Sequence, residues 1–316
     1  MSVLSVRDLE ISFKLGGVWH PAVNGVSFDV ERNETLCIVG ESGCGKSITA
    51  LSIMGLLTDA ARIEGSIEFD GQNLLKVREK ELEKLRGDKL AMIFQEPMTS
   101  LNPVLKIGLQ IAEPLMFHKG LSQSTAWKQA KNLLDLVRIP DAATRLNQYP
   151  HQLSGGMRQR VMIAIGLACK PDVLIADEPT TALDVTIQAQ VLALLNDIRK
   201  EQDLSIILIT HDLGVVANVA DRVAVMYAGE LVELADVADL FERPSHPYTQ
   251  ALLSSIPRAD RTDHLVPIRG QVPPIHCMPT GCRFSPRCDE VTNQCDAKPY
   301  LRGDTHLTRC WMRGGD

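Results

Sequence analysis

Residues 40–47 read GESGCGKS, a glycine-rich turn that ends in a lysine and a serine. The turn follows the apolar stretch 35–40 and precedes a helical pattern, and its glycines allow backbone N–H groups to face phosphate oxygens. We expect Lys46 to reach the β- and γ-phosphates of a nucleotide and the Ser47 hydroxyl to bind magnesium. A turn without a ligand is the alternative, which the flanking strand and helix disfavour. The residues expected to bind the nucleotide are Gly40, Ser42, Gly43, Cys44, Gly45, Lys46, Ser47 and Ile48.

Two adjacent carboxylates, Asp177 and Glu178, end the apolar stretch VLIADE. Asp177 has the position of a carboxylate that holds magnesium, directly or through water. Glu178, one residue further on, is placed to orient or deprotonate an attacking water molecule. A carboxylate pair at the end of a strand can also be an ordinary solvated loop. The phosphate-binding loop in the same chain favours the catalytic interpretation.

A second anion-binding pattern lies in LSGGMRQR, residues 153–160. Ser154, Gly155 and Gly156 stand directly before an apolar helical run, so the exposed N–H groups of a helix N-terminus are available there. The question is why one chain needs two phosphate sites.

The elements that must position these residues alternate between strands and helices. We expect an α/β fold, because short stretches that are apolar on both faces suit the buried strands of a helix-covered parallel sheet. The expected strands are 35–40, 89–95, 172–178, 205–211 and 222–229, and the expected helices are 46–57, 123–137, 156–168 and 186–202. The stretches 9–13, 23–30 and 65–71 indicate an added small antiparallel sheet. The composition becomes rich in proline after Phe241, which places a boundary near residue 240.

The composition limits the class of protein. The chain has 316 residues, of which 45% are hydrophobic, and a net charge of −6, which disfavours a general nucleic-acid-binding protein. No apolar run approaches the roughly 18 residues of a membrane span, and the N-terminus does not resemble a signal peptide. We therefore expect a cytosolic chain, in which the 8 cysteines are buried thiols or metal ligands rather than disulfides.

Three further polar residues complete the pattern. Gln95 and His211 each end an expected strand, and Asp184 follows the carboxylate pair. Together with the phosphate loop and the LSGGM segment, in this order, they resemble the ATP-binding subunits of ABC transporters over residues 1 to about 240. The resemblance implies a P-loop NTPase (RecA-like) core, an antiparallel β subdomain, an α-helical signature subdomain at about 96–160 and a small irregular C-terminal extension.

The resemblance also implies roles for these residues. Two chains pack head to tail, and the signature residues of each chain cap the γ-phosphate of ATP on the partner's phosphate loop, which explains the second phosphate site. Glu178 is then the catalytic carboxylate, and His211 contacts the γ-phosphate. Gln95 senses magnesium and the attacking water. By this resemblance, the residues that face the partner's ATP are Ser154, Gly155, Gly156 and Asp184. The residues that bind magnesium are Ser47, Gln95 and Asp177. An aromatic side chain usually stacks on the adenine, and the candidates are Trp19, which we favour, and Phe13.

The C-terminal part, residues 241–316, contains His246-Pro247-Tyr248 and resembles the tail of dipeptide and oligopeptide importer ATPases. The loop FQEPMTSLNPV is similar to that group as well. The resemblance implies import of short peptides, with a second ATPase subunit, two membrane permease subunits and an extracytoplasmic peptide-binding protein, at the cytoplasmic face of the bacterial inner membrane. Nickel importers and antimicrobial-peptide systems share this tail and are alternatives.

Four cysteines of the tail have wide spacing, C-x5-C and C-x6-C followed by a later cysteine. A metal could stabilise a tail with little core, and four thiolates suit a [4Fe-4S] cluster or zinc. We expect the cluster first, because some peptide-importer ATPases have one in this tail, zinc second and free thiols third. Cys277 is an alternate ligand. The expected ligands are Cys282, Cys288, Cys295 and Cys310.

Two rival functions differ in class from a transporter. A soluble ABC ATPase of DNA repair, chromosome structure or translation usually has coiled coils, two fused ATPase units or a basic surface, and this sequence has none of these features. A non-catalytic nucleotide-gated scaffold does not need Glu178 and His211, both of which are present.

Overall fold

The computed structural model describes residues 2–96, 100–181, 183–255 and 268–313. Two compact units make up the chain. The first unit comprises residues 1–3, 31–34 and 76–209, and the second unit comprises residues 4–30, 35–75 and 210–316.

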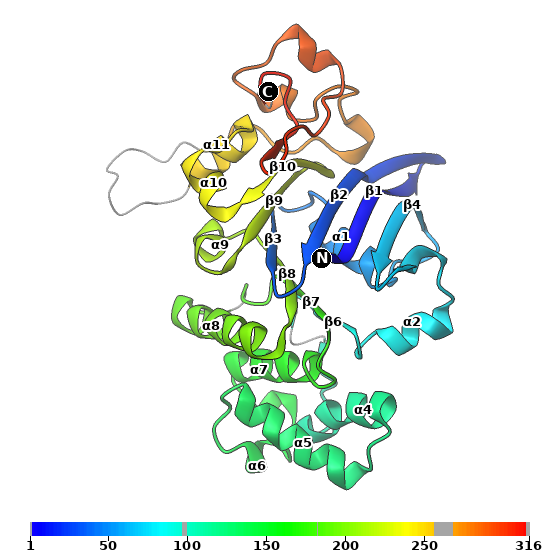
Figure 1. Ribbon diagram of the computed structural model, residues 1–316, viewed down its shortest axis with the longest axis vertical. Helices are drawn as coiled ribbons and strands as arrows, with labels where there is room; N and C mark the ends of the chain where they lie inside the picture. Colours follow the sequence, from blue (N-terminus) through cyan, green and yellow to red (C-terminus); the bar gives the residue numbers. More distant parts are fainter. Residues whose placement is uncertain (1, 97–99, 182, 256–267, 314–316) are drawn as a thin grey trace. The chain divides into compact units, whose positions relative to one another are not determined.

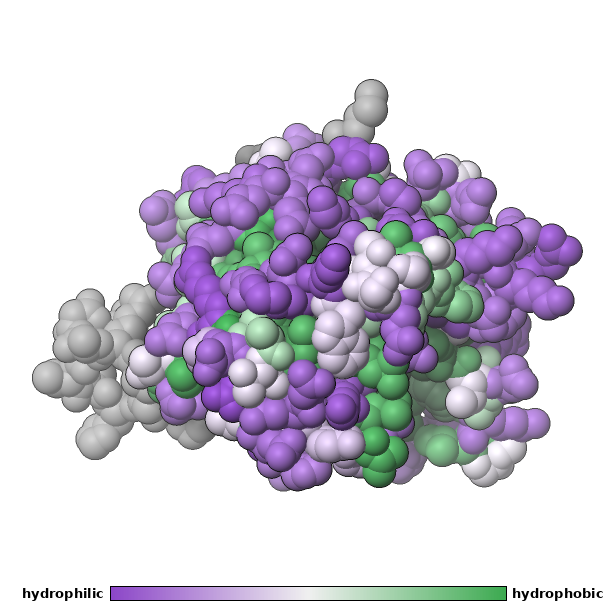
Figure 2. Space-filling view, turned by 90° about the horizontal axis from the view of Figure 1, so that it is seen from below, coloured by the Kyte–Doolittle hydropathy of each residue, from purple (hydrophilic) through white to green (hydrophobic). Residues whose placement is uncertain are grey.

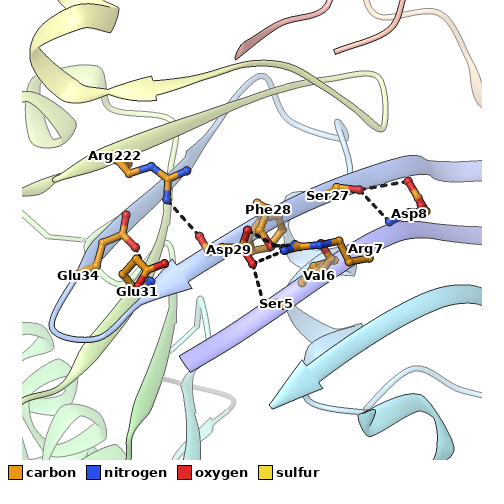
Figure 3. A network of polar contacts seen from close by, with 10 residues as sticks. All are labelled: Ser5, Val6, Arg7, Asp8, Ser27, Phe28, Asp29, Glu31, Glu34 and Arg222. Atoms are coloured by element: carbon orange, nitrogen blue, oxygen red, sulfur yellow. Dashed lines mark hydrogen bonds and ion pairs between the residues drawn. The ribbon is translucent and has the colours of Figure 1, made fainter. Parts of the chain in front are cut away.

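The second unit contains the antiparallel sheet that the sequence predicts. Its strands are β1 (Ser2–Leu15), β2 (Val18–Glu31), β4 (Ala61–Phe69) and β5 (Gln72–Asn73), in the order β2-β1-β4-β5. The strands β1 and β2 are tied by side chains as well as by backbone, because Arg7 Nη2 contacts both carboxylate oxygens of Asp29, at 2.6 and 2.8 Å (Figure 3). In the same network Arg222 donates to the carbonyl oxygen of Asp29.

The second unit also contains a mixed group of strands with one parallel pair. Strand β3 (Thr35–Val39) pairs in parallel with β9 (Arg222–Tyr227), β9 pairs antiparallel with β10 (Glu230–Asp236), and β10 pairs antiparallel with β11 (Leu307–Thr308). Every residue of β3 is buried, as its apolar sequence predicts. The helices of this unit are α1 (Lys46–Ile53), α9 (Leu213–Val219), α10 (Val237–Glu242) and α11 (Pro247–Ser254).

The first unit combines three parallel strands with a group of helices (Figure 1). The strands β6 (Leu90–Ile93), β7 (Val173–Asp177) and β8 (Ser205–Thr210) lie in the order β6-β7-β8. The helices are α2 (Glu79–Leu85), α4 (Ile107–Lys119), α5 (Gln123–Leu136), α6 (Ala142–Arg145), α7 (Gly155–Gly166) and α8 (Val185–Gln202). Helices α4, α5 and α7 pack on one another, and α7 packs on β6. The predicted strands and helices are thus confirmed, mostly with small differences at their ends, but β1 and β2 extend well beyond the predicted stretches 9–13 and 23–30.

The part of the tail that follows α11 is irregular, as predicted. It contains the short 3-10 helices η3 (Ile275–Cys277), η4 (Ser285–Arg287) and η5 (Asn293–Asp296), and β11 joins it to the sheet of the second unit. The boundary near residue 240 stays a prediction.

The end of the first unit that contains α4–α6 is mostly hydrophilic, with separate apolar groups (Figure 2). Three large apolar side chains of this unit are nevertheless strongly exposed: Val104 at 75%, Phe117 at 70% and Val185 at 83%. Among the helices of the described residues, none combines the length and the hydropathy needed to cross a membrane.

Candidate nucleotide site

The predicted phosphate loop connects β3 to α1 in the second unit (Figure 1). Gly40 has a φ of +152°, and a Cβ there would lie 2.1 Å from the carbonyl oxygen of Met226. The loop is also fixed further on, because the N–H of Gly229 donates to the carbonyl oxygen of Cys44 at 2.9 Å. Only glycine therefore fits where the loop leaves β3, and the turn between β9 and β10 supports it.

The ammonium group of Lys46 is folded over this loop. Its Nζ donates to the carbonyl oxygens of Gly40, at 2.7 Å, and Glu41, at 3.0 Å, and the side chain is buried. Cys44 is buried beside it, and burial raises the pKa of the Cys44 thiol. The site therefore combines one buried positive charge with a neutral thiol and the N-terminus of α1, an environment that favours an anion.

The predicted carboxylate pair follows β7 in the first unit. Asp177 is buried as the last residue of the strand. Glu178 has a φ of +45°, in the left-handed region, and its N–H donates to the carbonyl oxygen of Ile209 at 2.9 Å. A non-glycine residue in this region costs about 1–3 kcal/mol, so the surrounding structure fixes this turn.

Two donors hold one oxygen of this carboxylate. Gln95 Nε2 donates to Glu178 Oε2 at 3.0 Å, and Thr181 Oγ1 donates to the same oxygen at 2.8 Å. The structure thus brings together two of the predicted catalytic residues, Gln95 and Glu178. Thr181 is a further residue of this site that the sequence reasoning missed. The only signal for it is a hydroxyl three residues after the glutamate.

The signature residues begin α7, as predicted. Ser154 is the N-cap residue and accepts a hydrogen bond from the N–H of Met157 at 3.4 Å. Ser154 and Gly155 are exposed, and a Cβ at Gly155 would meet no atom within 4 Å. The exposed segment Ser154–Gly155 therefore has room for a ligand or a second chain.

Asp184 and the signature residue Gly156 both lie next to Ile187. Its side chain caps α8 by accepting from the N–H of Ile187 at 2.9 Å. A Cβ at Gly156 would lie 2.8 Å from Cγ2 of the same Ile187. The N-termini of α7 and α8 therefore pack together, with Ser154 and Asp184 as their caps.

The remaining nucleotide candidates belong to the second unit. His211 is exposed and follows the last residue of β8. Phe13 is half-buried on β1, opposite Ala61 of β4. Trp19 is 41% exposed on β2 and lines a pocket with Glu10, Ser12, Pro21, Arg62 and Glu64. The phosphate loop and His211 thus lie in the second unit, whereas Asp177, Glu178, Gln95, Asp184 and the signature residues lie in the first.

The four predicted cysteine ligands of the tail line one small cavity. His246, Phe284 and Trp311 also line it, whereas Cys277 is exposed and is not among the residues around it. Burial raises the pKa of Cys282 to about 11. Within the part of the chain that the structure describes, no group of three or more His, Cys, Asp or Glu side chains is arranged to hold a metal ion. The donor set fits a thiolate-bound metal, but its present arrangement does not form a ligand shell. The cysteines that line the cavity are Cys282, Cys288, Cys295 and Cys310.

Comparison with known proteins defines the class. The sequence profile of the ABC transporter family matches residues 23–181, and that of the oligopeptide/dipeptide transporter C-terminal region matches residues 232–295. The ATP-binding cassette MJ0796, solved as a dimer in a post-hydrolysis state with ADP and Pi, matches with a TM-score of 0.67 and 28% identity, over 74% of this chain and 98% of that chain. The chain belongs to the ABC transporter family, as one of its ATPase subunits, and its fold is that of the P-loop ATPase cassettes.

More similar relatives define the branch of the family. The dipeptide transport ATP-binding protein DppD of Bacillus subtilis is 52% identical, over 98% of this chain and 95% of that protein. The oligopeptide transport ATP-binding protein OppD of Escherichia coli is 48% identical, over 95% of this chain and 89% of that protein. The chain is thus a member of the dipeptide and oligopeptide transport branch.

Proposed function

We propose that this chain hydrolyses ATP to power the import of short peptides. The observation that supports it most is the Gln95–Glu178–Thr181 contact, because it orients a carboxylate as an ATPase needs it. The choice of peptides as cargo rests on the names of the relatives and on the matched tail, residues 232–295.

In this proposal the phosphate loop, residues 40–48, binds the triphosphate of ATP. When ATP binds, the ammonium group of Lys46 leaves the carbonyl oxygens of Gly40 and Glu41 and donates to the β- and γ-phosphates instead. Ser47, Gln95 and Asp177 hold Mg²⁺, which neutralises charge on the phosphates when it is bound.

Hydrolysis then needs an oriented water molecule. Glu178 accepts its proton, and Gln95 and Thr181 fix the orientation of that carboxylate. His211 contacts the γ-phosphate.

Trp19 stacks on the adenine in preference to Phe13, because Trp19 is exposed and lines a pocket. A Trp19→Ala variant should therefore weaken ATP binding about tenfold. A tenfold loss in Phe13→Ala, with unchanged binding in Trp19→Ala, would assign the adenine to Phe13 instead.

The signature residues serve a second chain. Ser154, Gly155 and Gly156 cap the γ-phosphate of ATP bound to the partner, and Asp184 contacts the partner at the same seam. The exposure of Ser154 and Gly155 supports this role, because a helix N-terminus that is open to solvent can receive an anion from outside the chain. We favour a related, non-identical ATPase subunit as the partner.

The same complex includes two membrane permease subunits and, indirectly, an extracytoplasmic peptide-binding protein. The chain then lies peripherally at the cytoplasmic face of the bacterial inner membrane and binds no nucleic acid. The exposed apolar side chains of Val104 and Phe117 support contact with the permeases, since exposed apolar groups are common in protein interfaces.

We also propose a metal centre in the tail, with a [4Fe-4S] cluster first and zinc second. The support is the single cavity that the four cysteines share. Purification without oxygen tests this directly. A brown protein with about four iron atoms per chain, as the definition of the cluster requires, supports the cluster. Bound zinc supports the second choice, and a colourless, metal-free protein contradicts both.

Reconstitution tests the transport function. The chain should be purified from native membranes with its associated polypeptides, placed in proteoliposomes and supplied with the peptide-binding protein. ATP-dependent uptake of labelled di- and oligopeptides, absent in Glu178→Gln, is the expected result. Uptake of nickel or of antimicrobial peptides instead would favour those alternatives, and recovery without any membrane subunit would favour a soluble ABC ATPase.

A further inference from the structure

The second residue of the phosphate loop is held by the C-terminal tail. The guanidinium group of Arg287 forms a two-point ion pair with the carboxylate of Glu41, with Nη1–Oε2 at 2.7 Å and Nη2–Oε1 at 3.0 Å. The Arg287 side chain is only 5% exposed, and that of Glu41 is 27% exposed. A two-point ion pair with little exposure is stronger and more directional than an ordinary surface ion pair.

The tail also binds the backbone of the same residue. The N–H of Glu41 donates to the hydroxyl oxygen of Tyr248 at 3.0 Å. Tyr248 lies in the first turn of α11 and is fully buried. Its ring packs on Tyr227 and Phe284, with centroid distances of 4.7 and 5.4 Å. Arg287 lies over the ring of Tyr227, so both groups that hold Glu41 belong to one packed cluster.

The backbone N–H of Tyr248 is held in turn by the side chain of His246. The Nδ1 atom of His246 accepts from the N–H of Tyr248 at 3.0 Å, and burial lowers the pKa of His246 to about 3. The ring is therefore neutral and can accept this hydrogen bond. The histidine and tyrosine of the His246-Pro247-Tyr248 motif thus act together, the first by capping α11 and the second by reaching the phosphate loop.

The other side of Glu41 faces the lysine of the loop, because its carbonyl oxygen accepts from Lys46 Nζ. A loop that is ordered before its ligand arrives loses less conformational entropy on binding. Arg287 also neutralises the Glu41 carboxylate, which would otherwise repel a nearby triphosphate. Both effects should increase the affinity for ATP.

We propose that Arg287 and Tyr248 are positioning residues for the phosphate loop, through which the tail sets the ATP affinity of the chain. This inference rests on the proposed role of residues 40–48 in binding ATP. It assigns to the tail a function at the nucleotide, separate from cargo and from any metal.

The test compares Arg287→Met and Tyr248→Phe with the wild type in the full chain. The readouts are the Kd for the fluorescent analogue MANT-ATP with Mg²⁺, and the KM and kcat for ATP in the complete transporter. We expect the Kd and the KM to rise about 5- to 30-fold in Arg287→Met and about 3- to 10-fold in Tyr248→Phe, which correspond to the loss of one or two hydrogen bonds. The kcat should stay within about twofold, because chemistry depends on other residues.

The matched control is Arg269→Met, which removes a tail ion pair with Asp289 whose side chains are 83% and 80% exposed. This variant should bind ATP like the wild type. Arg287→Lys keeps the charge but not the two-point geometry and should give an intermediate KM. If Arg287→Met fails to fold, Tyr248→Phe decides the question alone, because it removes one oxygen and keeps the packed ring.

A Lys46→Ala variant distinguishes a failure of the proposed nucleotide site from a failure of the positioning role alone. Unchanged MANT-ATP binding in Lys46→Ala would contradict the proposed nucleotide site itself. Loss of binding in Lys46→Ala, together with wild-type Kd and KM in Tyr248→Phe and in every folded Arg287 variant, would overturn the positioning role alone.

Discussion

The side-chain amide of Gln95 donates to Glu178 Oε2 across 3.0 Å, although the two residues are 83 positions apart in the sequence. Gln95 follows β6, and Glu178 follows the neighbouring strand β7. The contact therefore depends on parallel pairing, which brings the carboxyl ends of the two strands to the same edge. It places a carboxylate with a fixed orientation beside the residue proposed to sense magnesium and water.

The first prediction concerns the base. Glu178→Gln keeps the size of the side chain but removes its ability to accept a proton, so kcat should fall about 10²- to 10⁴-fold. ATP binding should persist, and the closed dimer should accumulate because ATP is not consumed. Phosphate release measures kcat, and size-exclusion chromatography with ATP measures the dimer. Turnover at the wild-type rate in this variant would show that the base is another residue.

The second prediction concerns the orientation of that base. Thr181→Val removes a donor to Glu178 Oε2 and keeps the shape of the side chain. We expect kcat to fall about three- to tenfold while the Kd for ATP is unchanged, because the lost contact acts on the carboxylate and not on the nucleotide. Thr125→Val, at an exposed site on α5, is a suitable control. A wild-type kcat in Thr181→Val would mean that the Thr181 hydroxyl is not needed to orient the carboxylate.

The third prediction is that substitutions at the adjacent residues Gly155 and Gly156 have different effects. Gly155→Asp meets open space and places a negative charge at a helix N-terminus, where it does not destabilise the fold. That charge should repel the partner's γ-phosphate, so ATP-dependent dimerisation and turnover should be lost while MANT-ATP binding remains. Gly155→Ser is the neutral control. Normal dimerisation of Gly155→Asp would contradict the assignment of this segment to the partner's ATP.

Gly156→Val should behave differently. Its Cβ would lie 2.8 Å from Cγ2 of Ile187, so α7 and α8 would have to move apart. Overpacking of this kind costs about 1–3 kcal/mol of the free energy of unfolding. Denaturation in urea measures the loss, and unchanged stability would show that this contact relaxes easily.

The fourth prediction concerns the attachment of the tail. Glu233 on β10 is fully buried, and its carboxylate accepts from the N–H groups of Ser245 and His246 at 2.7 and 2.8 Å and contacts His306 Nε2 at 2.6 Å. Glu233→Ala leaves these groups without their acceptor, so the free energy of unfolding should fall by about 2–4 kcal/mol. Asp289→Ala, at an exposed tail ion pair, should change it by less than about 0.5 kcal/mol. Equal stability of the two variants would contradict this role of Glu233.

Much of this fold follows from local pattern. The strands β3, β7 and β8 are apolar on both faces, and the caps Ser154 and Asp184 stand directly before their helices, so neighbouring residues suffice to predict them. Helix α4 is not among the helices that the sequence predicts. It contains Pro114 and has no clear apolar face, so the usual helix signals are weak there.

The contacts that the sequence did not predict are long-range and made by single side chains. Arg287 and Glu41 are 246 residues apart, and neither lies in a repeating pattern. Glu233 stands between apolar residues in β10, which gives no sign of a polar partner, and its partners are Ser245 and His246, just before α11, and His306. Such pairs depend on tertiary packing, which periodicity and motif spacing do not encode.

The central claim is that ATP is bound between two chains, each of which supplies part of the site. Dilution tests this claim most directly: the ATPase rate per chain should be measured from micromolar to nanomolar concentration, for the purified chain alone and with an equimolar amount of the ATPase subunit recovered with it. We predict that the rate per chain falls with dilution and is restored by concentration, because only the dimer is active. A rate per chain that stays at its full value at nanomolar concentration, where the chain is a monomer, would contradict the account.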